Sequence, residues 1–281
     1  MAFTFAYTKA VFFGSDNALA IALVPFSNPA IFIPLDTFHL WFLYYLIFIT
    51  IASVLLGLLL IKSKKLTNRI TQSFNWLFQK PLIRILFFSS ITFVLHLFIE
   101  TSMVETSVSF ILDLNTFIFY FFFYLVGWIL FKSKHLLVTM MRYDWIHIFL
   151  AILLATIQGL IIQNSSPEII LNSKTLMVLS SIIVWLFTFG ITGLFIRYYS
   201  KYSRRMRYIS DASYWVYLIH LPLTAILPAF ISEWAIPAIA KFFVVLVVTT
   251  SICFASYHYF VRATFIGEFL NGRKYSLKIK N

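Results

Sequence analysis

The sequence predicts an all-α, polytopic membrane protein with about seven transmembrane helices. The chain is 61% hydrophobic and only 11% charged, whereas a soluble domain carries roughly 25% charged residues. Phenylalanine alone accounts for 33 of the 281 residues. The apolar runs are continuous rather than alternating, which argues against a β-barrel, and lipid admits only helices and closed barrels.

Seven apolar runs approach or exceed the length that a helix needs to cross the hydrocarbon core, which is roughly 20 residues. We expect the spans at 39–61, 82–99, 115–131, 145–163, 175–197, 211–231 and 236–261. The third run is the shortest, but it carries no charge. The only cysteine, Cys253, excludes a disulfide framework and a cysteine-based metal site, and we expect no bound metal.

The charges between the runs are unevenly distributed. Segments 62–84, 132–144 and 197–211 and the tail after the last span together hold 19 basic and 3 acidic residues, and the rest of the chain holds 3 and 7. Lysine and arginine mark the cytoplasmic ends of membrane spans, and these four segments alternate with the other connections. We therefore expect the N-terminus outside, the C-terminus in the cytoplasm, and no nucleic-acid partner despite the net charge of +12.

Two parts of the chain follow from this topology. Residues 39–281 form the predicted transmembrane domain, and residues 1–38 form an outer-side segment. Pro25, Pro29 and Pro34 interrupt that segment, and proline is a poor residue for a helix interior. Either residues 1–38 contain an interfacial or re-entrant element, or the chain lacks spans that related proteins possess.

Two polar features lie at the expected outer ends of spans. His39 and Trp41 open the first span, where they form either an interfacial aromatic belt or part of a site. His96 and Glu100 are four residues apart and are expected to share one helical face. Ionisable groups within the membrane usually face a cavity or a partner, so these two residues either pair with each other or act in a site.

A third feature is the sixth expected span, in which Tyr214 and Tyr217 precede His220 and Pro222. His220 is either a structural hydrogen-bonding group or the marker of a cavity. We expect it to face the protein interior beside a kink at Pro222, because a polar ring in hydrocarbon leaves hydrogen-bonding groups unsatisfied.

The stretch from Arg69 to Arg84 is a basic cytoplasmic connection, which either signals topology or contacts an anionic donor. The sequence contains no phosphate-binding glycine loop, zinc-type cluster, nucleophile elbow or dinucleotide fingerprint.

Two motifs resemble a known family. Residues 39–46 (HLWFLYYL) resemble a span opening of the acyltransferase 3 family of membrane O-acyltransferases, and residues 211–222 (DASYWVYLIHLP) resemble its late helix signature. Residues 121–132 and 267–273 fit the branch that contains glucan biosynthesis protein C, a succinyltransferase for periplasmic glucans. The resemblance covers roughly residues 35–275.

The resemblance implies transfer of an acetyl or succinyl group from cytoplasmic acyl-CoA, as co-substrate, to a carbohydrate or glucan hydroxyl. It also implies a protein surrounded by membrane lipid, in a bacterial inner membrane, with no bound cofactor. Members of the family have ten helices with both termini in the cytoplasm, and an essential arginine and histidine in the first helix. Nothing before His39 resembles that helix, so we expect a member without the first three spans and with little or no activity alone.

Acyl transfer to a hydroxyl needs a base and donors for the developing oxyanion, and imidazole suits the first task. The candidate catalytic residues are His39, His96 and Glu100 on the outer side. The candidate substrate-binding residues are Trp41, Arg69, Arg84, Tyr214, Tyr217 and His220.

Two other function classes remain open. A carrier or lipid-flipping protein would use the same cavity without chemistry, and a seven-helix receptor would share the topology. Against a retinal-type receptor, Lys241 lies near the outer end of the last span rather than deep within it.

Overall fold

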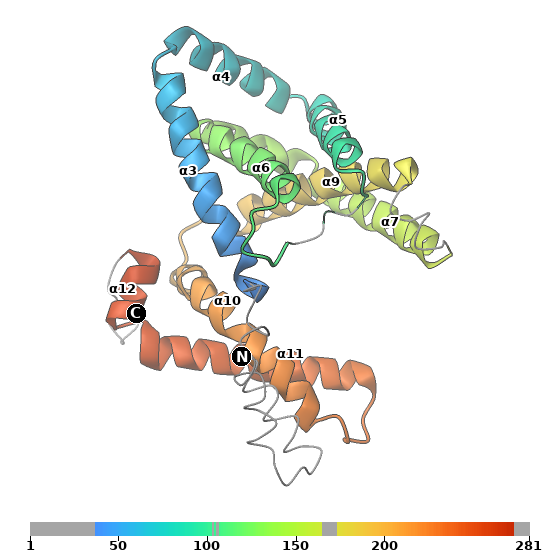
Figure 1. Ribbon diagram of the computed structural model, residues 1–281, viewed down its shortest axis with the longest axis vertical. Coiled ribbons are helices and arrows are strands. Elements are labelled where there is room, and N and C mark those ends of the chain that lie inside the picture. Colours follow the sequence, from blue (N-terminus) through green and yellow to red (C-terminus); the bar gives the residue numbers. More distant parts are fainter. Residues whose placement is uncertain (1–36, 103, 105–106, 165–172, 273–281) are drawn as a thin grey trace. The chain divides into compact units, whose positions relative to one another are not determined.

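The structure is a computed structural model that describes residues 37–102, 104, 107–164 and 173–272. The described residues form helices and contain no β-strand. Seven of the helices are long and apolar enough to cross a membrane (Figure 1). The expected all-helical architecture with seven spans is therefore confirmed. The expected outer-side segment 1–38 lies, apart from its last two residues, outside the described part of the chain.

The spans begin and end close to the expected positions. They are α3 (Trp41–Ile61), α5 (Pro81–Ile99), α6 (Leu114–Lys132), α7 (Asp144–Gln163), α9 (Lys174–Tyr199), α10 (Arg204–Phe230) and α11 (Ala238–Ser256), which continues into a π-helical turn, η4 (Tyr257–Val261). The largest difference is at α10, which starts seven residues before the expected 211. Ser203 caps this helix by accepting a hydrogen bond from the Met206 N–H at 3.4 Å. The first two turns after this cap are basic rather than apolar, which is why the apolar run begins later than the helix.

Within the described residues, four shorter helices connect or flank the spans: η2 (Phe38–Leu40), α4 (Lys64–Phe78), η3 (Lys134–Arg142) and α12 (Phe265–Asn271). The sequence predicted only a basic connection between the first two spans, and α4 corrects that prediction. This helix buries Phe74, Leu77 and Phe78, which lie on one face at a spacing of three and four residues. Its other residues are too polar to register as an apolar run.

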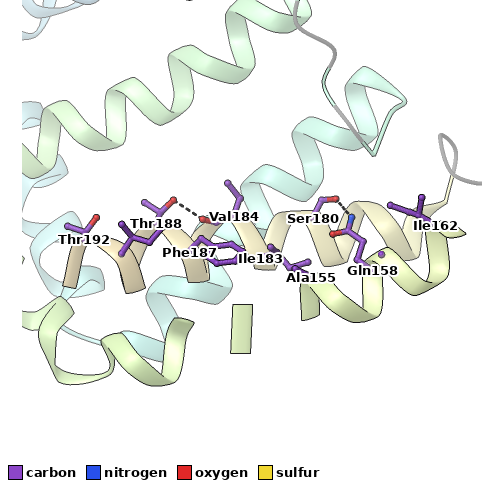
Figure 2. Close-up of a pocket in the computed structure, with 11 residues that line it drawn as sticks. Ala155, Gln158, Ile162, Ser180, Ile183, Val184, Phe187, Thr188 and Thr192 are labelled. Carbon is purple, nitrogen blue, oxygen red and sulfur yellow. Dashed lines mark hydrogen bonds between the residues drawn. The ribbon is translucent and has the colours of Figure 1, made fainter. Parts of the chain in front are cut away.

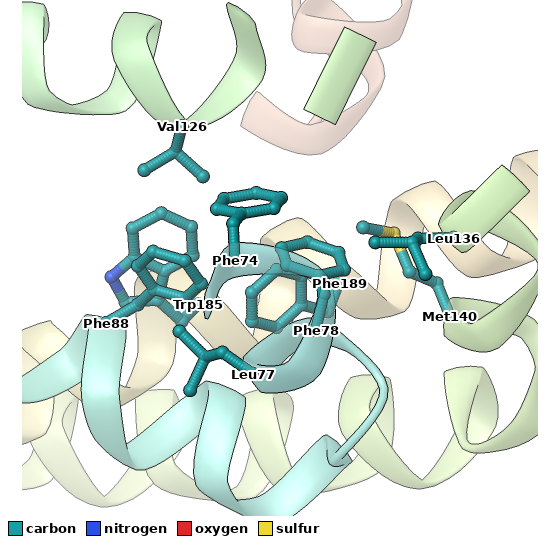
Figure 3. Packing of buried hydrophobic residues seen from close by; sticks show 9 residues of the cluster. All are labelled: Phe74, Leu77, Phe78, Phe88, Val126, Leu136, Met140, Trp185 and Phe189. Carbon is teal, nitrogen blue, oxygen red and sulfur yellow. The ribbon is translucent and has the colours of Figure 1, made fainter. Parts of the chain in front are cut away.

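The chain divides into two compact units. The first contains Trp41–Lys201, and its core is a cluster of aromatic rings from α4, α5 and α9 (Figure 3). Trp185 is 1% exposed, and its ring stacks on Phe88 at 4.7 Å and on Phe123 at 5.0 Å. The Trp185 indole N–H donates to the Thr92 hydroxyl at 2.8 Å, so the polar atom of this buried ring is satisfied.

An ion pair joins the start of α7 to the end of α9 in the first unit. The Arg197 guanidinium donates to both carboxylate oxygens of the buried Asp144, at 2.6 and 3.0 Å. Gly193 allows this close packing, because a Cβ there would lie 2.6 Å from the Met140 carbonyl oxygen. The bidentate contact therefore holds α7 and α9 together at this end, and the close backbone approach at Gly193 packs α9 against the segment 134–142 that precedes α7.

The second unit contains the described residues 37–40 and 202–272. Here α10 packs against α11, and the Trp215 indole N–H donates to the Ser256 hydroxyl at 3.0 Å. A small core forms around the fully buried Ala212, Tyr257 and Val261. The unit therefore has a core of its own.

Asp113 caps α6, and this cap makes a testable pH prediction. Its carboxylate accepts hydrogen bonds from the Thr116 backbone N–H at 2.8 Å and from the Thr116 hydroxyl at 2.5 Å. Burial acts to raise the pKa of Asp113, but these hydrogen bonds outweigh it and hold the pKa below its usual value.

A carboxylate whose pKa is lowered on folding stabilises the protein above its unfolded pKa of about 4, and this contribution is lost as the pH falls through the lower folded pKa. Asparagine caps a helix about as well as aspartate but does not titrate. We therefore expect the wild-type melting temperature to fall more than that of Asp113→Asn between pH 5 and about pH 3, measured by thermal unfolding in detergent. Equal losses in the two proteins would show that this carboxylate does not contribute.

Candidate functional site

His39 is held against α10 within the second unit. Its imidazole Nε2 donates to the Leu218 carbonyl oxygen at 3.2 Å, and the Tyr217 hydroxyl donates to the His39 carbonyl oxygen. His39 lies in the short helix η2, which is closed by a hydrogen bond from the Leu40 N–H to the Thr37 carbonyl oxygen at 2.9 Å. Two hydrogen bonds therefore fix both the backbone and the ring of His39.

Pro222 explains why the Leu218 carbonyl is free to accept. In a regular helix the N–H of residue 222 would donate to the carbonyl of residue 218. Proline has no N–H, and its ring pushes that carbonyl away from the helix axis. Pro222 lies inside α10, so it leaves the Leu218 oxygen without its helical donor, and His39 supplies the replacement.

This hydrogen bond also fixes the tautomer of His39. A carbonyl oxygen can only accept, so Nε2 must carry the hydrogen, and the lone pair of the neutral ring lies on Nδ1. The Nδ1 atom is buried and has no hydrogen-bond partner. His39 is thus oriented through one nitrogen, while the other nitrogen is an unused acceptor.

Two predicted substrate-binding residues lie beside this histidine. The ring of His220 lies edge-on to the ring of His39, with centroids 5.7 Å apart, and the ring of Tyr217 is 5.9 Å from both. His220 Nδ1 donates to the Tyr217 carbonyl oxygen at 2.8 Å. His220 is half-buried and close to Pro222, which agrees with the expectation that it faces the protein beside the kink. The structure therefore brings together His39, Tyr217 and His220, which the sequence predicted separately.

His220 lies near the middle of the apolar part of α10. The helix runs from Arg204 to Phe230, but its first two turns, before Asp211, are basic. His220 is nine residues after Asp211 and ten residues before Phe230. The histidine pair therefore lies about midway along the apolar part of this span.

The predicted pair of His96 and Glu100 is not formed. The helix α5 ends at Ile99, and Glu100 adopts a left-handed conformation with φ of 60°, so the four-residue spacing no longer places the two side chains on one face. The buried His96 donates through Nδ1 to the Thr101 carbonyl oxygen at 2.8 Å, and the Glu100 side chain is exposed. This geometry supports a structural role for His96, as a cap at the end of α5.

Trp41 and Tyr214 have other surroundings. Trp41 belongs to the first unit, where it packs against Tyr45 and against Tyr120 at a centroid distance of 5.3 Å. Tyr214 lies on α10 one turn before Tyr217, and its side chain is 52% exposed.

The two predicted donor-binding arginines have different surroundings. Arg69 is exposed on α4 and lines a groove. Arg84 is fully buried, and its guanidinium lies over the rings of Phe78 and Phe189 at 4.9 and 4.3 Å. Its Nη1 donates to the Phe78 carbonyl oxygen and to the Thr139 hydroxyl. The geometry therefore gives Arg84 a role in packing α4, α5 and α9 and presents no surface for a donor.

A second groove of the first unit, with a volume of about 600 Å³, runs along α7 and α9 (Figure 2). Its polar lining includes Gln158, whose amide donates to the Ser180 hydroxyl at 2.7 Å, and Thr188, whose hydroxyl donates to the Val184 carbonyl oxygen. None of the described residues that line it carries a titratable side chain. Proton transfer therefore has no candidate group among them.

Sequence reasoning missed the role of the Leu218 carbonyl, although the signal was present. A proline inside a helix always frees the carbonyl four residues earlier, and position 218 is four residues before Pro222. It also missed the pairing of Asp144 with Arg197. Opposite charges at the facing ends of neighbouring spans could have suggested that pairing.

Comparison with known proteins gives one match. The family model described as an acyltransferase domain matches residues 1–258. The match thus includes the first 34 residues, which the resemblance drawn from the sequence left out. No curated protein and no solved structure matches the chain.

Proposed function

Because the chain belongs to the acyltransferase domain family, we propose that this membrane protein transfers an acyl group from acyl-CoA to a carbohydrate hydroxyl. The observation that carries the proposal is the geometry of His39, which is anchored through Nε2 and has an unpartnered, buried Nδ1. A hydroxyl that donates to Nδ1 would fill this open hydrogen-bonding position. A base whose tautomer is set by the hydrogen bond at its other nitrogen is the arrangement that acyl transfer requires.

In the proposed reaction an ester C–O bond forms and the thioester C–S bond breaks. His39 Nδ1 takes the proton of the sugar hydroxyl as its oxygen attacks the thioester carbonyl carbon. The C–S bond of the tetrahedral intermediate then breaks, and the imidazolium returns the proton to the departing thiolate. The products are an ester on the carbohydrate and free CoA, and His39 ends in its starting state.

The substrate classes rest on the sequence resemblance. They are an acetyl- or succinyl-CoA donor from the cytoplasm and a glucan acceptor on the outer side of a bacterial inner membrane.

Release of CoA thiol by the purified chain, residues 1–281, tests the proposal. Acetyl-CoA and succinyl-CoA are supplied with and without periplasmic-type glucans, and we expect release that depends on the glucan. A carrier or a receptor would release no thiol, so the absence of release by this chain would contradict the proposal. Release of equal size without an acceptor would indicate thioester hydrolysis instead.

Pro222→Ala tests the anchoring of His39. Alanine restores an N–H that competes with His39 for the Leu218 carbonyl, so the ring loses its fixed position. Misplacement of a catalytic group by about 1 Å can lower the rate by about a hundredfold. We expect acyl transfer to fall by about ten- to a hundredfold, measured as the initial rate of glucan-dependent thiol release.

Pro228→Ala is the matched control. Pro228 also lies inside α10, but its replacement restores a donor to the carbonyl of Thr224, which is not bonded to His39. We expect that variant to retain most of its activity. Equal losses in the two variants would mean that α10 responds to any loss of a proline rather than to the His39 contact.

A further inference from the structure

A groove lies between α4 and the first half of α5 in the first unit. Its volume is about 810 Å³, which is within the range of sites that hold small molecules. The residues that line it are Arg69, Ile70, Gln72, Ser73, Phe74, Trp76, Leu77, Ile83 and Phe87. None of these residues belongs to the histidine site, which lies in the second unit.

The lining of the groove is mostly apolar, with a polar edge on α4. The positions of Arg69, Ser73 and Trp76 on that helix are four and three residues apart and share one helical face. On α5, Ile83 and Phe87 are four residues apart, and this wall is open, since the two side chains are 39% and 46% exposed. A polar edge with a cation therefore borders an apolar groove, which is an arrangement that fits an amphiphile.

The charge around the groove is of one sign. The segment from residue 62 to residue 84 carries six basic residues and no acidic one, and the ammonium group of Lys80 lies 4.3 Å from the centre of the Trp76 ring. Basic amphipathic helices with tryptophan and leucine on the other face lie in the membrane interface. Anionic lipids of the cytoplasmic leaflet attract such segments.

We propose that this groove binds an anionic phospholipid. The lipid phosphate contacts Arg69 and the hydroxyl of Ser73 on α4, and one acyl chain lies along Trp76, Ile83 and Phe87. The polar edge with Arg69 favours an occupant that carries a negative charge, and the apolar lining favours one that carries an alkyl chain. This proposal does not rest on acyl transfer, since it needs only that α4 and α5 meet a membrane.

Quenching of Trp76 by lipids with brominated chains tests the proposal. The full chain in detergent is titrated with phosphatidylglycerol or phosphatidylcholine that carries bromines on one acyl chain. The signal of Trp76 is the difference between the wild type and Trp76→Phe, which keeps the groove apolar. We expect stronger quenching by phosphatidylglycerol, and we expect Arg69→Gln to weaken that binding about fivefold, since one basic residue contributes about 1 kcal/mol to such contacts.

Lys64→Gln is the matched control, because it removes the same charge from the same helix and does not line the groove. We expect it to leave the quenching close to that of the wild type. The proposal is overturned if both lipids quench Trp76 equally, or if Arg69→Gln and Lys64→Gln weaken binding alike. Relief of the quenching by added CoA would also overturn it and assign the groove to the acyl donor. Each of these measurements reports lipid binding, so a chain without acyltransferase activity would still show whether the groove binds the lipid.

Discussion

Replacing His39 with glutamine is expected to lower the rate constant of acyl transfer by about 10²–10⁴-fold, the range that general-base catalysis contributes. Glutamine keeps an N–H that can donate to the Leu218 carbonyl oxygen, which His39 contacts at 3.2 Å. It has no basic nitrogen to take a hydroxyl proton. The variant thus removes the chemistry while it preserves the anchor, and the turnover number at saturating acyl-CoA and glucan measures the loss.

His96→Gln separates this effect from the loss of any buried histidine. His96 is 4% exposed and bonds the Thr101 carbonyl oxygen at the end of α5, a contact that a glutamine amide can retain. We expect it to keep turnover within a fewfold of the wild type. A loss in His96→Gln as large as that in His39→Gln would place the base in the first unit and refute the assignment made from Nδ1 of His39.

Trp185→Ala is expected to give the largest loss of stability. Its ring is 1% exposed and stacks between those of Phe88 and Phe123, and its indole N–H bonds the Thr92 hydroxyl. Truncation of a buried tryptophan leaves a cavity and typically destabilises a protein by about 3–5 kcal/mol. It also leaves the Thr92 hydroxyl without its donor. The free energy of unfolding in mixed micelles measures the effect.

Two variants test whether the loss follows from burial. Trp185→Phe keeps most of the ring volume and should lose less than Trp185→Ala. Trp234 is 52% exposed, so Trp234→Ala should change the free energy of unfolding by less than about 0.5 kcal/mol. If Trp185→Ala matched the exposed control, the aromatic cluster of Figure 3 would not be the core of the first unit.

The spans were predictable from the sequence because a helix that crosses the hydrocarbon core must consist mostly of apolar residues. Each expected run lies within a few residues of a helix, and the main exception is the polar start of α10, which Ser203 caps. The helix α4 was not predicted, because its buried side is only Phe74, Leu77 and Phe78 among mostly polar residues. An amphipathic helix of this kind is visible from its periodicity rather than from its mean hydropathy.

The candidate site was predictable residue by residue but not as an arrangement. His39, Tyr217 and His220 were each identified from their chemistry, but they are brought together by tertiary contacts between segments about 180 residues apart. For His96 and Glu100, the sequence predicted a shared helical face that the structure does not form, because that prediction assumed that the helix continues past Ile99. Local spacing predicts a shared face only where the helix persists.

The most direct test of the central claim is detection of the acylated carbohydrate itself. The purified chain and its His39→Gln variant are incubated with succinyl-CoA or acetyl-CoA and a glucan, and the glucan is analysed by mass spectrometry. The structure predicts ester-linked acyl groups on the glucan with the wild type. At equal protein concentration and incubation time, the variant should produce fewer of them by a factor of about 10² or more. Acylation that is equal in the two samples, or acyl groups on neither, would contradict the account.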